Sequence, residues 1–318
     1  MFKYIVKRIL SSIPIILIIT IIAFTLIQLA PYDAIDTIIK PTMSQEQIDA
    51  LKAAHGLDKP AIVQYFYWLK NVMQGDLGNS IVHGSNIAQS LAERIPNTIA
   101  LVLPAFMISF VISVILGLLA GANKGKRIDR FVEGLCSIGI SIPTFWIAIL
   151  LIIFFASTLK LLPTNGMYTI GGSKSFYDFL LHAIMPWTTL VIGLTPEMIK
   201  YVRSSTIGQL NEDYVLVQRA YGASNFKIIS VHVFKNVLIP IVTIFGTLLP
   251  MLVTGAFVTE SIFSWPGVGK YFLDAVKQFD YPIIMAVLLI SSALVIIGNL
   301  IADILYCVID PRIREMKS

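Results

Sequence analysis

The chain has 318 residues, of which 56% are hydrophobic and 14% are charged, and its mean hydropathy is +0.78. Soluble domains carry about 25% charged residues, so this composition excludes a disordered chain, a secreted disulfide scaffold and an ordinary cytosolic enzyme. The net charge of +5 comes without a basic patch interleaved with aromatic residues, which favours a membrane protein with basic loops over a nucleic-acid-binding protein. No metal site is expected, because Cys136 and Cys307 lie in apolar stretches without ligand spacing.

Six stretches are apolar and long enough to cross the ~30 Å hydrocarbon core of a bilayer as helices that rise about 1.5 Å per residue. The fourth contains Pro186 and Pro196, which membrane helices tolerate when they pack among neighbours. The first is too long for a signal peptide and has no small-residue cleavage site, so it is expected to remain as an anchor. The predicted spans cover residues 9–30, 97–121, 133–158, 183–203, 236–259 and 283–308.

The basic residues predict the orientation of these spans, because Lys and Arg are enriched in cytoplasmic loops. They gather in both tails and in the loops after the second and fourth spans, which places both termini in the cytoplasm. These residues are Lys3, Lys7, Arg8, Lys124, Lys126, Arg127, Arg130, Lys200, Arg203, Arg219, Lys227, Lys235, Arg312, Arg314 and Lys317. The predicted fold is therefore an all-α integral membrane protein. Its expected parts are a tail and first span (1–30), an extracytoplasmic loop (31–96), a core of spans two to six (97–308) with a cytoplasmic hairpin (204–235), and a tail (309–318).

The loop 31–96 is predicted to be folded. Ser44 and Gln47 form a capping-box pattern at the start of one helix, and Gly56 suits its end. A second helix is expected between Pro60 and Gly75, with inward-facing side chains at Ile62, Val63, Phe66 and Leu69. Two roles remain open for this loop: a cap that stabilises the helix bundle, or a docking surface for a soluble partner.

No catalytic or nucleotide-binding motif is recognisable in the sequence. Residues 121–127 approach the phosphate-binding pattern G-x-x-x-x-G-K-[ST], but they are one residue short and place Arg127 where Ser or Thr belongs. The four histidines are scattered, and no G-x-S-x-G elbow occurs. The chain is therefore expected not to be an enzyme, and energy for any work would have to reach it through contact with another protein.

Small residues within the spans predict close helix packing, and polar residues within them predict pairing or a polar path. Gly117 and Gly121 form a G-x-x-x-G pattern that allows close helix packing. Glu197 and Asp303 lie near predicted cytoplasmic span ends, where pairing with Lys200, Arg203 or Arg312 is the favoured interpretation. Hydroxyl groups near the middle of the spans either line a polar path or bond between helices; those taken as path candidates are Ser109, Ser113, Thr144, Thr243, Thr247, Thr254 and Ser291.

The cytoplasmic loop 204–235 is predicted to form a helix–turn–helix hairpin. Asn211 to Asp213 suit a helix N-terminus, Gly222 supplies a left-handed stop, and Ser224 can cap a second helix. Tyr214, Val217 and Tyr221 recur at helical spacing, whereas Phe226, Ile229, Val233 and Val237 are expected to carry the second helix into span five. Exposed apolar surface of this kind usually marks a protein contact. The alternative is a hairpin that lies flat on the bilayer.

The same hairpin, Asp213-Tyr-Val … Arg219-Ala-Tyr-Gly222 followed by Asn236-Val-Leu-Ile-Pro240, resembles the cytoplasmic loop of binding-protein-dependent ABC importer permeases. The dipeptide, oligopeptide and nickel branch is the most similar, and the resemblance covers nearly the whole chain. Further motifs of this branch are Arg94-Ile-Pro-Asn-Thr98, Ser141-Ile-Pro-Thr-Phe-Trp146, Leu162-Pro-Thr-Asn-Gly166, Glu260-Ser-Ile-Phe-Ser-Trp-Pro-Gly-Val-Gly269, Asp280-Tyr-Pro282 and Asp310-Pro-Arg-Ile-Arg314.

The resemblance implies a type I importer permease in the cytoplasmic (inner) membrane. Its implied partners are a second homologous permease, two cytoplasmic ATPases that bind ATP and Mg, an extracytoplasmic substrate-binding protein and the lipid bilayer; the chain itself would bind no cofactor. The implied cargo is short peptides, with nickel or metal–chelator complexes as the alternative. The residues implied in ATPase coupling are Glu212, Asp213, Tyr214, Gln218, Arg219, Ala220, Tyr221, Gly222, Ala223 and Ser224.

One departure from the family pattern concerns this coupling segment. The general importer loop has Glu-Ala-Ala beginning six residues before the Gly, where this chain has Leu216, Val217 and Gln218. A polar contact to the ATPase would then fall to Glu212, Asp213 or Arg219. Two other classes of protein stay open. The first is an ATPase-independent secondary transporter or channel, which predicts a charged residue near the bilayer midplane or two repeated halves of the sequence. The second is a membrane scaffold without transport.

Overall fold

The computed structural model describes residues 2–30, 34–39, 42–237 and 257–309. Within these ranges the secondary structure is helical, apart from one isolated antiparallel bridge between Asn79 and Asn86. The all-α class predicted from the sequence is confirmed for this part of the chain. Most of the predicted fifth span lies outside the described residues.

Four of the six predicted spans are long apolar helices in the described part of the chain. They are α1 (Phe2–Gln28), α5 (Ile87–Ala122), α8 (Phe176–Leu210) and α14 (Tyr281–Ile309). α5 and α8 begin earlier than predicted because the side chains of Asn86 and Ser175 cap their first turns, accepting hydrogen bonds from the backbone N–H groups of Gln89 and Asp178 at 3.0 and 3.1 Å.

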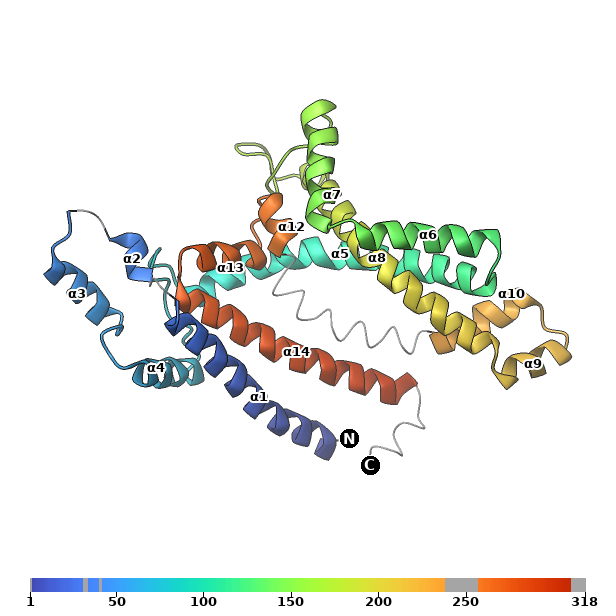
Figure 1. The fold of residues 1–318 in the computed structure, drawn as a ribbon, viewed down its shortest axis with the longest axis horizontal. Coiled ribbons are helices and arrows are strands. Elements are labelled where there is room, and N and C mark those ends of the chain that lie inside the picture. The colour runs from blue at the N-terminus through green and yellow to red at the C-terminus, as the bar shows by residue number, and fades with distance from the viewer. Residues whose placement is uncertain (1, 31–33, 40–41, 238–256, 310–318) are drawn as a thin grey trace.

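Two groups of helices make up the molecule (Figure 1). α1 lies alongside α14, whereas α5 and α8 form the most extensive helix pair and carry α6 (Arg127–Ser141) beside them. The N-terminal end of α1 and the C-terminal end of α14 lie toward the same end of the molecule as the connection between α5 and α6. The predicted position of these segments on the cytoplasmic side of the membrane stays a prediction.

The predicted third span, 133–158, is not one continuous helix. α6 meets α7 (Thr144–Leu151) at 90°, and α7 continues as the π-helix η1 (Ile152–Thr158). Pro143 causes the break because it has no N–H to donate and disfavours helical backbone at the preceding residue. Ile142 is accordingly extended, with φ −96° and ψ 120°. The sequence contained this signal, but its apolar composition suggested a single crossing.

Gly117 and Gly121 hold α5 against α8, as the G-x-x-x-G pattern predicted. A Cβ atom added to Gly117 would lie 2.5 Å from Cβ of Val202, and one added to Gly121 would lie 2.6 Å from Cβ of Thr206. Neither distance is possible without moving a backbone. Hydrogen in place of a side chain therefore allows the two longest apolar helices to touch along their shared face.

Gly117→Ala is expected to destabilise the chain by ~1–3 kcal/mol, because the added methyl group overpacks the contact with Val202. The matched control is Gly134→Ala, since Gly134 lies in α6 with open space around its Cβ position. That variant should be neutral or slightly stabilised, because Ala favours helix over Gly by roughly 0.5–1 kcal/mol. Thermal unfolding of the detergent-solubilised chain compares the two variants, and equal midpoints would contradict the packing role.

The segment after α1 contains α2 (Ala34–Ile38), α3 (Gln45–Ala54) and α4 (Ala61–Met73). The Ser44–Gln47 capping box is confirmed, with both reciprocal hydrogen bonds present. The predicted inward face of α4 is wrong for Ile62 and Phe66, which are 66% and 60% exposed, whereas Val63 and Leu69 are half-buried. The buried residue is Tyr65, since α4 packs against α1 rather than against its own loop.

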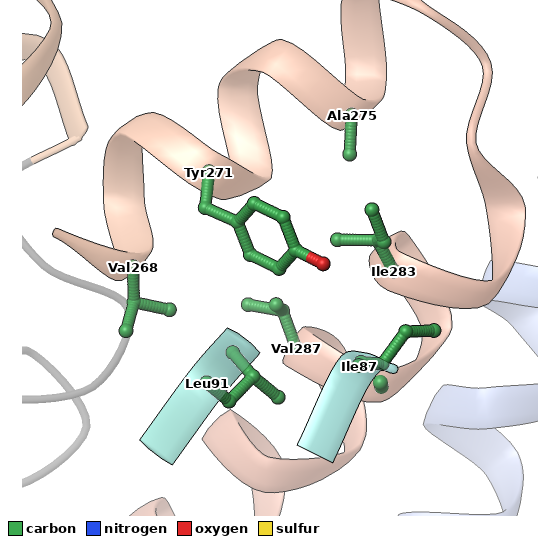
Figure 2. Packing of buried hydrophobic residues seen from close by; sticks show 8 residues of the cluster. Ile87, Leu91, Val268, Tyr271, Ala275, Ile283 and Val287 are labelled. Carbon is green, nitrogen blue, oxygen red and sulfur yellow. The ribbon is translucent and has the colours of Figure 1, made fainter. Parts of the chain in front are cut away.

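The segment before α14 contains α12 (Phe257–Ile262) and α13 (Val268–Lys277). α13 packs its Val268, Tyr271 and Ala275 against the starts of α5 and α14. Figure 2 shows these side chains directed toward those of the two neighbouring helices. Asp280, at the start of α14, accepts hydrogen bonds from Ser80 Oγ and from two backbone N–H groups of the 80–82 turn. The start of α14 is thereby tied to the segment before α5.

Glu260 forms a second buried polar connection, between α12 and α5. Its carboxylate is fully buried, with Oε1 accepting from Thr98 Oγ1 at 2.8 Å and Oε2 accepting from the Lys270 N–H at 2.9 Å. Trp265 Nε1 donates to the Asn97 carbonyl at 2.8 Å. Two motifs that lie far apart in the sequence, 94–98 and 260–269, therefore form one hydrogen-bonded unit.

Glu260→Gln is expected to destabilise the chain by ~1–3 kcal/mol. Both carboxylate oxygens accept hydrogen bonds, so the amide NH2 of Gln would face a donor and leave a buried group without a partner. Asp274→Asn is the control, because the Asp274 side chain is 41% exposed and pairs with the neighbouring Lys270 Nζ on the same helix. That change should cost well under ~1 kcal/mol. Thermal unfolding midpoints that fall equally in the two variants would contradict the structural role of Glu260.

Candidate coupling surface

The hairpin between α8 and the fifth span has the predicted helix–turn–helix form. α9 (Asp213–Ala220) ends in a turn in which Gly222 has φ +78°, and the Gly222 and Ala223 N–H groups donate to the carbonyls of Arg219 and Gln218. This is a Schellman motif, which requires a left-handed residue at the glycine position. α10 (Asn225–Lys227) follows, capped by Ser224 as predicted, and leads into the π-helix η2 (Ile228–Val233). The hairpin is shorter than predicted, since residues 204–210 belong to α8.

The inner face of the hairpin is fixed to the helix bundle. Val215, Ile228 and Val233 are buried against Val202 of α8, and side chains of α5 complete this cluster. Gln209, in the last turn of α8, accepts hydrogen bonds from Tyr214 Oη at 3.0 Å and from Asn236 Nδ2 at 2.9 Å. Both arms of the hairpin are thus bound to the end of α8.

The outer face of the hairpin is apolar and exposed. Tyr221 is 85% exposed and Phe226 is 81% exposed, and Leu216 and Val217 on α9 are also exposed. The hairpin was predicted to project apolar and aromatic side chains away from the bundle, and the exposed Tyr221 and Phe226 have this arrangement. The residues from Leu216 to Phe226 on this face are named the coupling patch below.

The ten predicted coupling residues fall into two sets. Exposed around the coupling patch are Glu212, Asp213, Arg219, Ala220, Tyr221, Gly222 and Ser224. Half-buried beneath it are Tyr214, Gln218 and Ala223, which hold the hairpin through the Gln209 bond and the Schellman turn. The structure therefore brings the predicted residues together on one projecting element, as an exposed set and a half-buried set.

An ion pair beside the hairpin was missed by sequence reasoning. Arg203 of α8 donates from Nε and Nη2 to the Asp129 carboxylate at 2.5 and 2.9 Å, and Glu133 lies 3.6 Å away. Asp129 also accepts from the Gly125 N–H. The predicted pairing of Arg203 with Glu197 is wrong, because Glu197 is exposed and Arg203 turns toward α6. The spacing of Asp129 and Glu133, one helical turn apart, was the available signal.

The described path candidates lie on three different helices and do not gather at one site. Ser109 and Ser113 are buried on α5, where they donate to the carbonyls of Ala105 and Thr195 at 2.9 and 3.2 Å. Ser291 is buried on α14 and bonds within its own helix. Thr144 is exposed at the start of α7. Thr243, Thr247 and Thr254 lie outside the described residues. Lining of a path by these residues stays a prediction.

Long apolar helices and a rigid hairpin with an exposed apolar face are the features expected of a membrane component that works with a separate motor. Residues 113–315 match the family of binding-protein-dependent transport system inner membrane components, and residues 1–102 match the N-terminal region of such membrane components. The chain belongs to this family and is a permease subunit of an ABC importer.

A curated relative and a solved structure support this assignment. The oligopeptide transport system permease protein AppB of Bacillus subtilis (strain 168) is 39% identical over 315 residues, which cover 99% of this chain and 100% of that protein. The fold is similar to that of a chain in an inward-facing crystal form of the MetNI methionine ABC transporter, with a TM-score of 0.55 and 18% identity over 70% of this chain and 97% of that one. At that identity the second comparison concerns the fold alone.

Proposed function

We infer that this chain forms half of the translocation path of an ATP-driven importer for short peptides, and that the coupling patch docks on an ATPase subunit. The observation that carries the docking is the contrast between the two faces of the hairpin. Its inner face is buried against α5 and α8, whereas its outer face exposes Tyr221 and Phe226 almost completely. Large exposed aromatic side chains on a rigid element are typical of a protein contact.

The proposed mechanism is movement of the hairpin as a rigid lever. Closure of an ATPase dimer on ATP and Mg would displace the hairpin, and the Gln209 hydrogen bonds would carry that displacement into α8. The remaining partners are a second homologous permease and an extracytoplasmic binding protein that delivers the peptide, with this chain's termini in the cytoplasm and its helices in the cytoplasmic membrane. Coupling requires that the hairpin contact the open and closed ATPase with different free energies.

The peptide cargo is supported by the relatives. AppB is named for oligopeptide transport and aligns with this chain from end to end. Metal cargo has no comparable support. Vesicles reconstituted with the complete transporter should take up a labelled short peptide only when ATP is supplied on the side of the membrane that carries the ATPase subunits. Uptake without ATP would favour a secondary transporter, and uptake of nickel alone would replace the peptide assignment.

Tyr221→Ser is expected to weaken the retention of ATPase subunits, because it removes the most exposed aromatic ring of the coupling patch. Interface aromatic residues of this kind contribute ~2 kcal/mol or more, so retention should fall by roughly 30-fold. Tyr177→Ser is the matched control, since Tyr177 is 71% exposed at the opposite end of α8. Co-purification with a tag on this chain measures retention. Equal retention in the two variants would contradict docking through the patch.

A further inference from the structure

α4 carries an exposed apolar stripe that its packing in the chain does not explain. Ile62, Phe66 and Met73 are 66%, 60% and 80% exposed, and they recur at helical spacing on one side of the helix. The neighbouring side of α4, with the buried Tyr65, packs against α1. Asn71 is exposed on the side of α4 opposite the stripe. α4 is therefore amphipathic with an apolar face wider than its contact with α1.

The stripe continues the outer surface of a membrane span. Thr20 Oγ1 and Tyr65 Oη lie 3.0 Å apart, and the Phe24 and Tyr65 rings pack edge to face with centroids 5.5 Å apart. Both contacts place α4 beside the C-terminal end of α1 (Figure 1). Only 11% of the apolar stretch of α1 is buried in the structure, so this span presents most of its surface outward.

An open apolar cleft of about 350 Å³ separates the two helices at this point. It is lined by Ile21, Phe24 and Thr25 of α1 and by Ile62, Tyr65 and Phe66 of α4. Its walls are almost wholly hydrocarbon and aromatic, and it opens on the same side as the exposed stripe. A flexible hydrocarbon chain fits a cleft of this shape and chemistry.

Basic and aromatic residues near the stripe indicate how deep α4 would lie in a bilayer. Lys70 is exposed on α4 beside the stripe, and Lys59 is exposed just before the helix, where its ammonium lies 4.5 Å from the centre of the Tyr67 ring. Lysine flanking an apolar face, with Tyr and Trp beside it, is the pattern of a helix that lies at the boundary between headgroups and acyl chains. A soluble-protein contact would not require basic residues beside the stripe.

We propose that α4 is an interfacial helix that lies in the membrane surface and binds phospholipid through Ile62, Phe66 and Met73, with an acyl chain in the cleft between α1 and α4. Lys59 and Lys70 then meet the phosphate groups. The lipid contact fixes the outer end of α1 and sets the height of the loop 34–86 above the membrane. This inference is independent of the coupling patch, which lies at the other end of the molecule (Figure 1).

The test is a spin-label accessibility measurement on the transporter in phospholipid nanodiscs that contain an anionic lipid. Phe66→Cys and Asn71→Cys are each labelled with a nitroxide in a chain that carries Cys136→Ser and Cys307→Ser. Position 66 lies in the stripe, and position 71 lies on the polar side of the same helix. The label at 66 should collide with oxygen and be shielded from a water-soluble nickel chelate, and the label at 71 should show the reverse.

Each other outcome overturns the proposal. Exposure of the label at 66 to the nickel chelate would place the stripe in water, and shielding from both reagents would place it against a protein. Met73→Cys provides the same measurement at a second position, should Phe66→Cys fail to assemble. The spin-label measurement does not depend on peptide uptake or on ATPase retention, so a negative result in either of those assays would not change its interpretation.

Discussion

Gly222→Val should strongly reduce coupled transport while leaving membrane insertion intact. Gly222 has φ +78°, and a β-branched side chain costs about 1–2 kcal/mol in that left-handed conformation. The Schellman turn that it closes fixes the angle between α9 and α10. A strain of this size shifts the balance between correct and altered turns by roughly 5–30-fold. We expect peptide uptake and substrate-stimulated ATP hydrolysis to fall together by a factor in that range.

The control for this prediction is Gly208→Val. Gly208 and Gly222 both have open space around the Cβ position, so neither substitution creates a clash. They differ in backbone, because Gly208 lies within α8 and has no positive φ. Parallel assays of ATP hydrolysis and uptake in reconstituted vesicles isolate the effect of the turn. Normal coupling in Gly222→Val, or equal losses in both variants, would contradict the lever.

Arg203→Gln is expected to give the largest loss of stability among the variants considered. It leaves the Asp129 carboxylate, which is 2% exposed, with the Gly125 N–H as its remaining hydrogen-bond donor. Removal of one partner from a buried ion pair costs ~3–5 kcal/mol, and the 21% exposure of Arg203 favours the lower end, about 3 kcal/mol. Because Arg203 lies two turns before the hairpin, the end of α8 should also become mobile.

Arg130→Gln removes the same charge from an exposed position on α6 and serves as the control. It should change the thermal unfolding midpoint little, since exposed charges contribute at most ~1 kcal/mol. The double variant Asp129→Asn with Arg203→Gln should recover part of the lost stability, because no charge is then left buried alone. If Arg203→Gln and Arg130→Gln unfold at the same temperature, the ion pair does not hold α6 to α8.

Local signals in the sequence were sufficient for much of the fold. Apolar length predicted α1, α5, α8 and α14, and the capping box at Ser44 and the glycine at 222 predicted helix ends that the structure confirms. These features depend on residues within a turn or two of one another. The third span shows the limit of this reasoning, because hydrophobic composition outweighed the signal of Pro143 and concealed a 90° bend.

The hairpin was likewise predicted only in part from the sequence. The sequence alone indicated a hairpin at Asp213–Gly222 and the family to which it belongs, because turn chemistry and motif order are written along the chain. Only the tertiary structure showed which side of that hairpin is free, placing Phe226 outward and Tyr214 inward. Helical periodicity fixes which residues share a face, but the direction of that face depends on which neighbouring helix covers it.

The class of protein, the long helices and the position of the projecting turn could therefore be predicted from the amino-acid sequence without coordinates. The tertiary structure alone decided the partners: Arg203 with Asp129, Glu260 with Thr98, and α4 with α1. The physical reason is distance along the chain. A helix forms from contacts a few residues apart, whereas a buried charge or an apolar stripe is satisfied by whichever distant segment the packing brings to it.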